Sequence, residues 1–144
     1  MVVGWSLSDR MTADIAAAAL ESAKSRGYVA GNAVFHSDRG ARYTGRTLAE
    51  RARASGVRLS CGRTGNCRDN AVAEPFFATL KNEMCYRRSF ATRADAKHAV
   101  VEFIEAGYNR RRPHSTIGYR IPAKAMESFF ERTMPESKVL PMAA

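Results

Sequence analysis

The chain has 144 residues, and 45% of them are hydrophobic, which is enough for one globular domain with its own core. An excess of Lys and Arg over acidic residues gives a formal net charge of +9 at pH 7, which favours polyanionic partners such as nucleic acid. No apolar run approaches the roughly 18 residues of a membrane-spanning helix, and no signal peptide is visible. We therefore expect a cytoplasmic protein without membrane contact.

Cysteine usage points to the same compartment. The three cysteines, Cys61, Cys67 and Cys85, form an odd set without a CxxC pair and without histidine or cysteine partners at zinc spacing. We expect reduced, buried or semi-buried thiols rather than disulfides or a zinc site.

The first third of the chain predicts a strand, a helix and a second strand. Residues 2–5 are largely apolar and indicate a strand. Residues 12–26 are rich in alanine and predict a helix with Thr12 as its N-cap and Gly27 as its stop. The largely apolar run 33–37 follows and predicts a buried strand.

The middle third predicts a helix, a strand and a longer helix. A helix is expected over residues 45–55, ending at Gly56, and the alternation over 57–61 predicts a short strand. A loop rich in Gly, Asn and Arg leads to a helix expected over residues 70–86. Pro75 removes a backbone hydrogen bond if that helix begins at its first expected residue, and it is tolerated if the helix begins about four residues later.

The last third predicts two further helices. Thr92 and Asp95 are spaced as a capping box for a helix over residues 92–106, and Pro122 opens another helix through residue 130. The tail from residue 133 is expected to be disordered. Because strands alternate with helices, the fold class is α/β, with a short mixed sheet flanked by helices.

An aspartate and a glutamate separated by 35 residues are the main candidates for chemistry. Asp38 follows the strand 33–37, and Glu74 lies at the start of a helix. Taken alone, Asp38 before Arg39 and Gly40 is typical of a turn, and Glu74 is typical of a solvated helix face. Taken together, carboxylates from a strand end and a facing helix can hold a hard divalent cation, because Mg²⁺ prefers oxygen ligands.

Longer motifs surround these two residues. His-Ser-Asp-Arg-Gly spans residues 36–40, and Asn-Ala-Val-Ala-Glu spans 70–74. Phe-Phe-Ala-Thr-Leu-Lys spans 76–81, and Tyr-Asn-Arg-Arg-Arg-Pro-His-Ser spans 108–115. With these motifs, nearly the whole chain resembles the C-terminal part of insertion-sequence transposases, which have an integrase-type catalytic core with an RNase H-like fold.

The resemblance implies metal-dependent DNA strand cleavage and strand transfer in DNA transposition and integration. Asp38 and Glu74 would be the second and third of three catalytic, metal-binding acids, with Mg²⁺ or Mn²⁺ as cofactor. In such transposases the first acid lies on a strand upstream of residues 2–5, so we expect an N-terminally truncated copy that lacks the first strands. We therefore expect this chain alone to bind the metal weakly and to show no useful catalysis.

The resemblance also implies the domain organisation. Residues 1–125 would form an incomplete integrase core with its C-terminal helices, and residues 126–144 the end of the last helix and the tail. The alternative is a non-enzymatic remnant that binds DNA, forms homo-oligomers or associates with an intact transposase.

Positive charge is concentrated around the candidate site, because residues 39–93 carry twelve Lys and Arg against four acidic residues. The candidate DNA contacts are Arg39, Arg42, Arg63, Arg68, Lys81, Arg110, Arg111 and Arg112. Lys81 lies two helical turns after Glu74 and therefore on the same helix face. A solvated basic face is the alternative, and the three consecutive arginines also suit a helix C-terminus.

Overall fold

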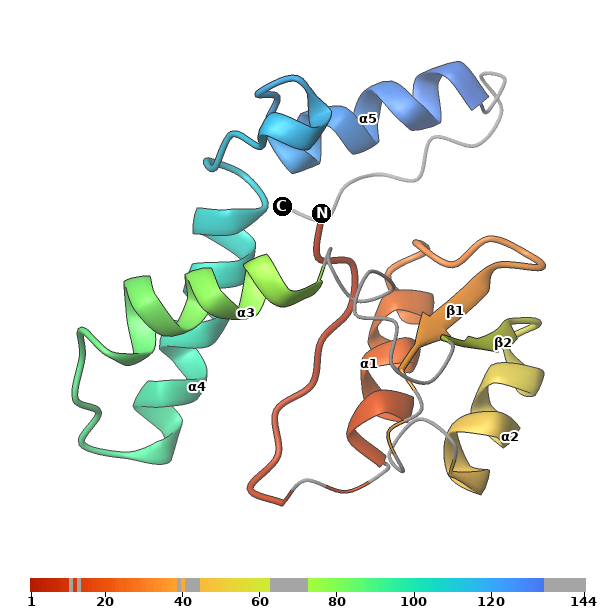
Figure 1. The fold of residues 1–144 in the computed structure, drawn as a ribbon, viewed down its shortest axis with the longest axis horizontal. Helices are drawn as coiled ribbons and strands as arrows, with labels where there is room; N and C mark the ends of the chain where they lie inside the picture. The colour runs from red at the N-terminus through yellow and green to blue at the C-terminus, as the bar shows by residue number, and fades with distance from the viewer. Residues whose placement is uncertain (11, 13, 39, 41–44, 63–72, 134–144) are drawn as a thin grey trace. The chain divides into compact units, whose positions relative to one another are not determined.

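The computed structural model describes residues 1–10, 12, 14–38, 40, 45–62 and 73–133. The elements are α1 (Asp14–Ser25), β1 (Val34–Ser37), α2 (Arg46–Ala54), β2 (Arg58–Cys61), α3 (Ala73–Leu80), α4 (Arg93–Glu102) and α5 (Pro122–Thr133) (Figure 1). They divide into two compact units, residues 3–89 and residues 1–2 with the chain from residue 90 onward. None of the described helices is both long and apolar enough to cross a membrane.

The sheet of the first unit is a parallel pair. Val34 of β1 lies opposite Arg58 of β2, and Ser37 lies opposite Cys61. The connection between the two strands runs through α2, as parallel pairing requires a crossover. Both strands were predicted to within one residue at each end, and the alternation of strands and helices confirms the α/β class.

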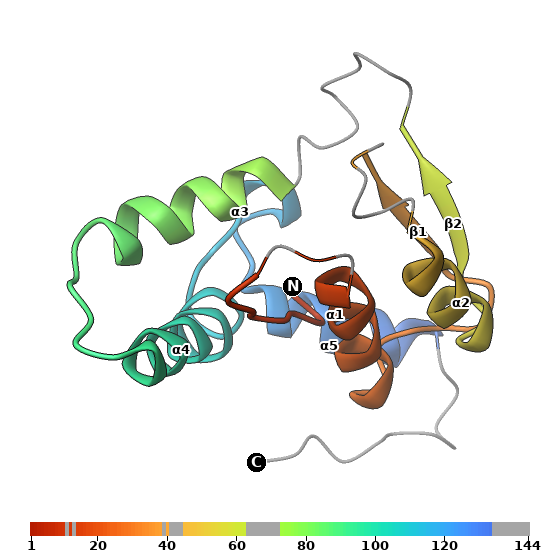
Figure 2. The same ribbon diagram turned by 90° about the horizontal axis from the view of Figure 1, so that it is seen from below.

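The core of the first unit lies between α1, α2 and the strands. Figures 1 and 2 both show α1 and α2 beside the strand pair. The buried cluster consists of Ala16, Ala17, Leu20, Leu48, Ala52 and Val57, with Val29, Ala33 and Phe35 packed against it. Leu48 is the most enclosed of these side chains, with 0% of its surface exposed. Small alanines on α1 and α2 allow the two helices to approach closely, so one large side chain fills the space between them.

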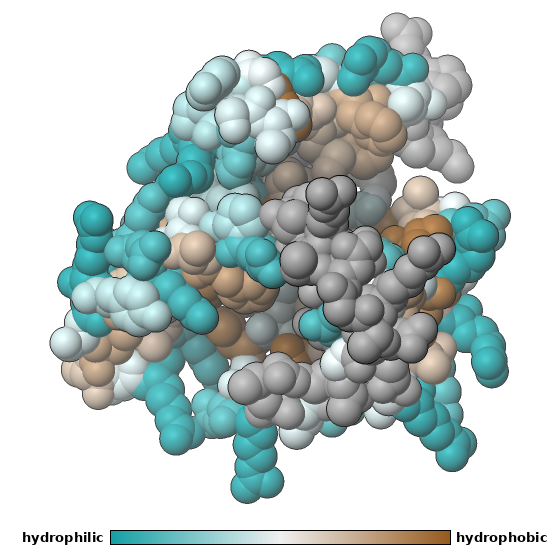
Figure 3. Space-filling model, in the orientation of Figure 1, coloured by the Kyte–Doolittle hydropathy of each residue, from teal (hydrophilic) through white to brown (hydrophobic). Residues whose placement is uncertain are grey.

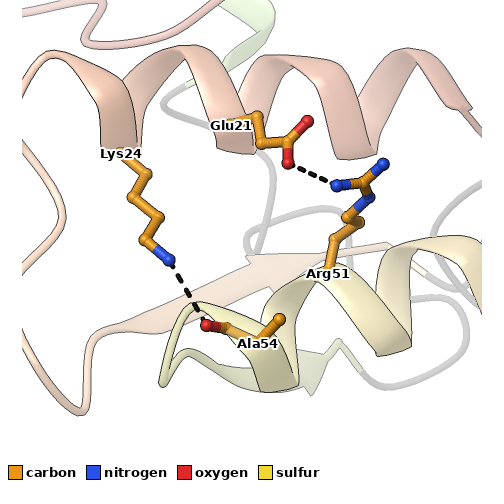
Figure 4. A network of polar contacts seen from close by, with 4 residues as sticks. All are labelled: Glu21, Lys24, Arg51 and Ala54. Atoms are coloured by element: carbon orange, nitrogen blue, oxygen red, sulfur yellow. Dashed lines mark hydrogen bonds and ion pairs between the residues drawn. The ribbon is translucent and has the colours of Figure 1, made fainter.

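Polar contacts at the edge of this core also join α1 to α2. Arg51 Nη1 donates to Glu21 Oε1 at 2.6 Å, and Lys24 Nζ donates to the carbonyl oxygen of Ala54 at 3.3 Å (Figure 4). The side chains of Arg51 and Glu21 are 54% and 51% exposed, so this ion pair contributes little stability compared with the apolar core.

The strand predicted for residues 2–5 is absent, which corrects the sequence-based expectation. A strand needs a hydrogen-bonded neighbour, but both backbone groups of Val2 are bound by a side chain instead. Asn109 Oδ1 accepts from the Val2 amide at 2.8 Å, and Asn109 Nδ2 donates to the Val2 carbonyl at 2.9 Å.

Further along, Gly4 lies directly against α1, where an added Cβ would come within 2.6 Å of the Ala23 Cβ.

The second unit begins its first helix as predicted. The Thr92 side chain accepts from the Asp95 amide at 3.1 Å, and the Asp95 carboxylate accepts from the Thr92 amide at 3.0 Å, which is a complete capping box.

In Figure 3 apolar surface is visible over α5, where Phe129 is 51% exposed.

Two wider helical turns were not predicted. After α3 the amide of Tyr86 donates to the carbonyl of Lys81, and after α4 the amide of Asn109 donates to that of Ile104, both at 2.9 Å. These bonds span five residues instead of four, so residues 81–85 and 103–108 form π-helical turns.

The prediction of buried or semi-buried cysteines is wrong for the two cysteines that the structure describes. Cys61 and Cys85 are free thiols, but both are exposed rather than buried. Cys67 and the tail from residue 134 lie outside the described residues, so the prediction of a disordered tail stays a prediction.

Candidate functional site

The two candidate carboxylates line the same pocket of the first unit. The pocket has a volume of about 690 Å³ and is bordered by the end of β1 and by one side of α3 and the turn after it. Its lining residues are Phe35, His36, Ser37, Asp38, Ala73, Glu74, Phe77, Ala78, Lys81, Asn82 and Tyr86. We refer to it as the carboxylate pocket.

Asp38 is presented by the end of β1. Ser37, the last residue of the strand, is buried at 7% exposure, whereas Asp38 is exposed. Asp38 Oδ1 accepts from the Gly40 amide at 2.9 Å, so the side chain also stabilises its own turn. The turn role is thus observed, and the same bond holds the carboxylate at the strand end, where the pocket lies.

Glu74 comes from the first turn of the described part of α3. Pro75 follows it in that turn, the part of a helix in which proline is tolerated. No residue of α3 is buried, and Phe77 is 54% exposed and lines the pocket. Glu74 is thus carried by a helix with weak apolar anchoring within the described residues.

Lys81 lines the pocket together with Glu74, as their seven-residue spacing predicted. It begins the first π-helical turn, at the end of α3. Among the described lining residues, two carboxylates outnumber one ammonium group. The pocket therefore favours a cation between the acids and offers one fixed positive group to an anionic ligand beside them.

Eight of the described lining residues were not among the predicted site residues, and they include His36, Asn82 and Tyr86. Asn82 and Tyr86 follow Lys81 on the same helical stretch, and Tyr86 is 74% exposed. His36 pairs its Nδ1 with Ser60 Oγ at 3.0 Å across the two strands. The available signal was the helical periodicity from Glu74, which continues through residues 81 and 82.

The other predicted DNA contacts are not among the described residues that line this pocket. Arg110, Arg111 and Arg112 follow α4 in the second unit. Arg39, Arg42, Arg63 and Arg68 lie outside the described residues, so their roles stay predictions.

The donor set suits a hard divalent cation, because the two acids offer carboxylate oxygens and none of the described lining residues is a cysteine. No cluster of three or more His, Cys, Asp or Glu side chains able to hold a metal occurs within the described residues. Within the described residues, the carboxylate pocket therefore brings together two carboxylate side chains.

Comparison with known proteins gives consistent results. Two family models, both described as integrase core domain, match residues 1–67 and 55–122. The transposase for insertion sequence element IS904 of Lactococcus lactis is 35% identical over 121 residues, covering 84% of this chain and 48% of the relative. Transposase InsF for insertion sequence IS3A of Escherichia coli is 38% identical over 117 residues, covering 81% and 41%. The chain spans about half the length, or less, of these curated relatives.

Solved structures show the same fold. The catalytic core domain of BIV integrase aligns with a TM-score of 0.62 at 21% identity, covering 88% of this chain and 79% of that one. The simian T-cell lymphotropic virus intasome aligns with a TM-score of 0.61 at 13% identity, covering 95% and 46%. The fold is therefore that of an integrase catalytic core, which is RNase H-like.

Proposed function

The chain belongs to the integrase core domain family, and from this premise we propose that it serves DNA transposition as the part of an insertion-sequence transposase that carries Asp38 and Glu74. The observation that supports this most directly is the shared pocket of the two acids, which lie 35 residues apart in sequence. The proposed reaction is cleavage and joining of DNA strands.

Asp38 and Glu74 are the residues that would hold Mg²⁺ or Mn²⁺. When bound, the cation supplies Lewis-acid chemistry at a phosphate. The chain's own contribution is positional: the end of β1 fixes Asp38, α3 carries Glu74, and Lys81 attracts the DNA phosphate to the side of the acids.

DNA binding is the second part of the proposal. Lys81 would contact DNA at the carboxylate pocket, and the arginines 110–112 would contact it from the second unit. The same role is proposed for Arg39, Arg42, Arg63 and Arg68. Because these contacts are to phosphates, we expect affinity to fall steeply with salt and to vary little with DNA sequence.

We expect the 144-residue chain by itself to bind the metal weakly and to cleave DNA poorly. Two carboxylates leave most of an octahedral coordination sphere to water and phosphate. The resemblance implies a third acid in such a site, and the described residues that line the pocket include only two.

A test uses Mn²⁺ titration of the whole chain by calorimetry. Asp38→Asn and Glu74→Gln should each weaken Mn²⁺ binding by at least roughly tenfold, because each removes one of two charged ligands. Glu131→Gln, an exposed acid on α5, makes the same charge change and should leave Mn²⁺ binding unaltered. Unchanged affinity in both pocket variants would contradict the assignment.

Nicking of supercoiled DNA in Mn²⁺ provides the second readout. The wild-type chain should nick little or not at all. Efficient nicking that is lost in both pocket variants would retain the transposase assignment and refute the expectation that the chain needs a further acid.

A non-enzymatic role is the second candidate, and the lack of a three-membered ligand cluster among the described residues favours it. The chain would then bind DNA or an intact transposase without metal chemistry. Salt-dependent DNA binding with no detectable Mn²⁺ binding would distinguish this role from the first.

A further inference from the structure

The turn over residues 114–120 holds the side chain of Tyr119 at the surface, in a backbone conformation that tyrosine rarely adopts. His114 and Arg120 form an isolated antiparallel bridge, with the His114 amide donating to the Arg120 carbonyl at 3.1 Å. The Tyr119 amide donates back to the His114 carbonyl at 2.8 Å. Two short backbone bonds therefore close this segment, which we call the Tyr119 turn, into a defined loop.

Within this turn the backbone conformation favours glycine at two successive positions. Gly118 has φ 66°, and Tyr119 has φ 58°. The first position carries the residue that adopts this region freely, but the second carries a side chain whose Cβ makes the region unfavourable. The backbone conformation alone would therefore favour glycine at position 119. The turn does not explain why a tyrosine is there.

Packing does not explain the tyrosine either. Tyr119 is 75% exposed, so most of its ring contributes nothing to the core of the second unit. A residue that is both backbone-strained and largely exposed indicates a function outside the fold. A flat aromatic surface held on a closed turn is suited to stacking on another flat group.

The charge around the turn indicates which group that is. Residues 108–120 contain four arginines and no acidic residue. Arg110, Arg111 and Arg120 are exposed, and Arg120 Nε donates to the Ile117 carbonyl at 3.1 Å, which fixes its guanidinium group beside the turn. The exposed ring is therefore surrounded in sequence by groups that attract phosphates.

The base of the turn is well supported. The His114 ring packs edge-on against Tyr108, with ring centroids 4.6 Å apart. The neighbouring Asn109 is 3% exposed, and its backbone carbonyl accepts from the Ala123 amide at the start of α5 at 2.9 Å. The ring of Tyr119 is thus displayed from a structured platform between α4 and α5.

We propose that the Tyr119 turn is a binding site for DNA that offers an unpaired base, with Tyr119 stacking on the base and the arginines contacting the flanking phosphates. Bases inside a duplex are already stacked, whereas a strand end or overhang exposes a free face, and aromatic rings bind such faces without sequence preference. The inference rests on the proposed function, because strand cleavage and transfer produce such ends, and it adds a site separate in sequence from the acids.

The test compares two fluorescent DNA probes by anisotropy with the full 144-residue chain. One is a blunt duplex, and the other is the same duplex with a short single-stranded overhang. Tyr119→Ala and Tyr119→Gly should each weaken binding of the overhang probe by roughly 5- to 100-fold and change binding of the blunt probe far less. Tyr119→Phe keeps the ring and should retain overhang binding.

Two controls separate stacking from loss of structure. Tyr119→Gly relieves the backbone conformation, so its thermal midpoint should be no lower than that of the wild type while its overhang binding is lost. Phe129→Ala removes another half-exposed aromatic ring of the same unit and should leave binding of both probes unchanged.

The outcomes are distinguishable. Equal overhang binding by the wild type and Tyr119→Ala overturns the stacking site even if the chain binds DNA well. A chain that binds neither probe contradicts the proposed function itself. A Tyr119→Ala variant that loses self-association rather than DNA affinity shows a protein contact and also overturns the proposal.

Discussion

The two units of this chain are stabilised by different means. Residues 3–89 bury apolar side chains from α1, α2 and the strand pair around Leu48. Among the described residues of the second unit, the buried apolar side chains are only Ala99, Ile104 and Pro122. Polar contacts stand out there instead: the capping box of α4, the paired bonds from Asn109 to Val2, and the closed turn at residues 114–120.

This difference matters for the two candidate binding sites. Asp38 follows a strand that packs on the apolar core, so its position depends on how well the core side chains fill the space against that strand. The Tyr119 turn depends on hydrogen bonds and on an uncharged His114. We therefore expect the first unit to be sensitive to cavities, and the second to be sensitive to lost polar partners and to pH.

The largest expected effect is a cavity in the first unit. Leu48→Ala should lower the free energy of unfolding by about 2–5 kcal/mol, because the side chain is fully enclosed and its neighbours are small. Leu59→Ala, at a side chain 38% exposed, makes the same chemical change and should cost far less. Urea denaturation followed by circular dichroism measures both, and equal losses would contradict the position of the core.

A smaller effect is expected from removing a polar clamp in the second unit. Asn109→Ala leaves the amide and carbonyl of Val2 without their side-chain partners and should cost about 1–3 kcal/mol. Asn82→Ala, at an exposed position, is the matched control for unfolding stability. If both variants unfold at the same urea concentration as the wild type, hydrogen bonding does not stabilise this unit as described.

The smallest effect is a pH dependence of the second unit. Burial lowers the pKa of His114 from its ordinary value near 6.5, and the positive charges of the chain's amino group and of Arg112 lower it further. The folded state therefore binds a proton less readily than the unfolded state. Stability is fully present above about pH 6.5 and is lost progressively as the pH falls from there towards the folded pKa.

Thermal melts between pH 8 and pH 5 measure this dependence. The wild-type melting temperature should decrease on acidification, and His114→Gln should reduce that decrease. His98→Gln, at an exposed position on α4, should not. An identical acid response in all three proteins would refute the role of His114.

The regular features of the fold were predictable because they depend on neighbours in sequence. The largely apolar run over 33–37 and the alternation over 57–61 predicted the strands found at 34–37 and 58–61, and the Thr92–Asp95 spacing identified the helix start correctly. The shared pocket of Asp38 and Glu74 followed from a motif resemblance rather than from periodicity. The π-helical turns were missed because one extra residue in a turn has no signature in the apolar pattern.

Features that depend on distant partners were not predictable. Residues 2–5 have strand composition, but no neighbouring strand pairs with them in the described part of the chain. Phe77 has the composition of a core residue and instead lines a pocket, because no residue of its helix is buried. The left-handed conformation of Tyr119 has no sequence signal, since tyrosine rarely adopts it.

The close approach of Gly4 to α1 limits how this sequence can diverge. Every other amino acid has a Cβ, and at position 4 that atom would meet the backbone of residues 19 and 23 as well as the Ala23 methyl group. Backbone atoms of a packed helix cannot rotate aside as a flexible side chain can. At Gly31, by contrast, nothing lies within 4 Å of an added Cβ. Steric clash therefore excludes substitution of Gly4 by a larger residue, whereas Gly31 has room for a side chain.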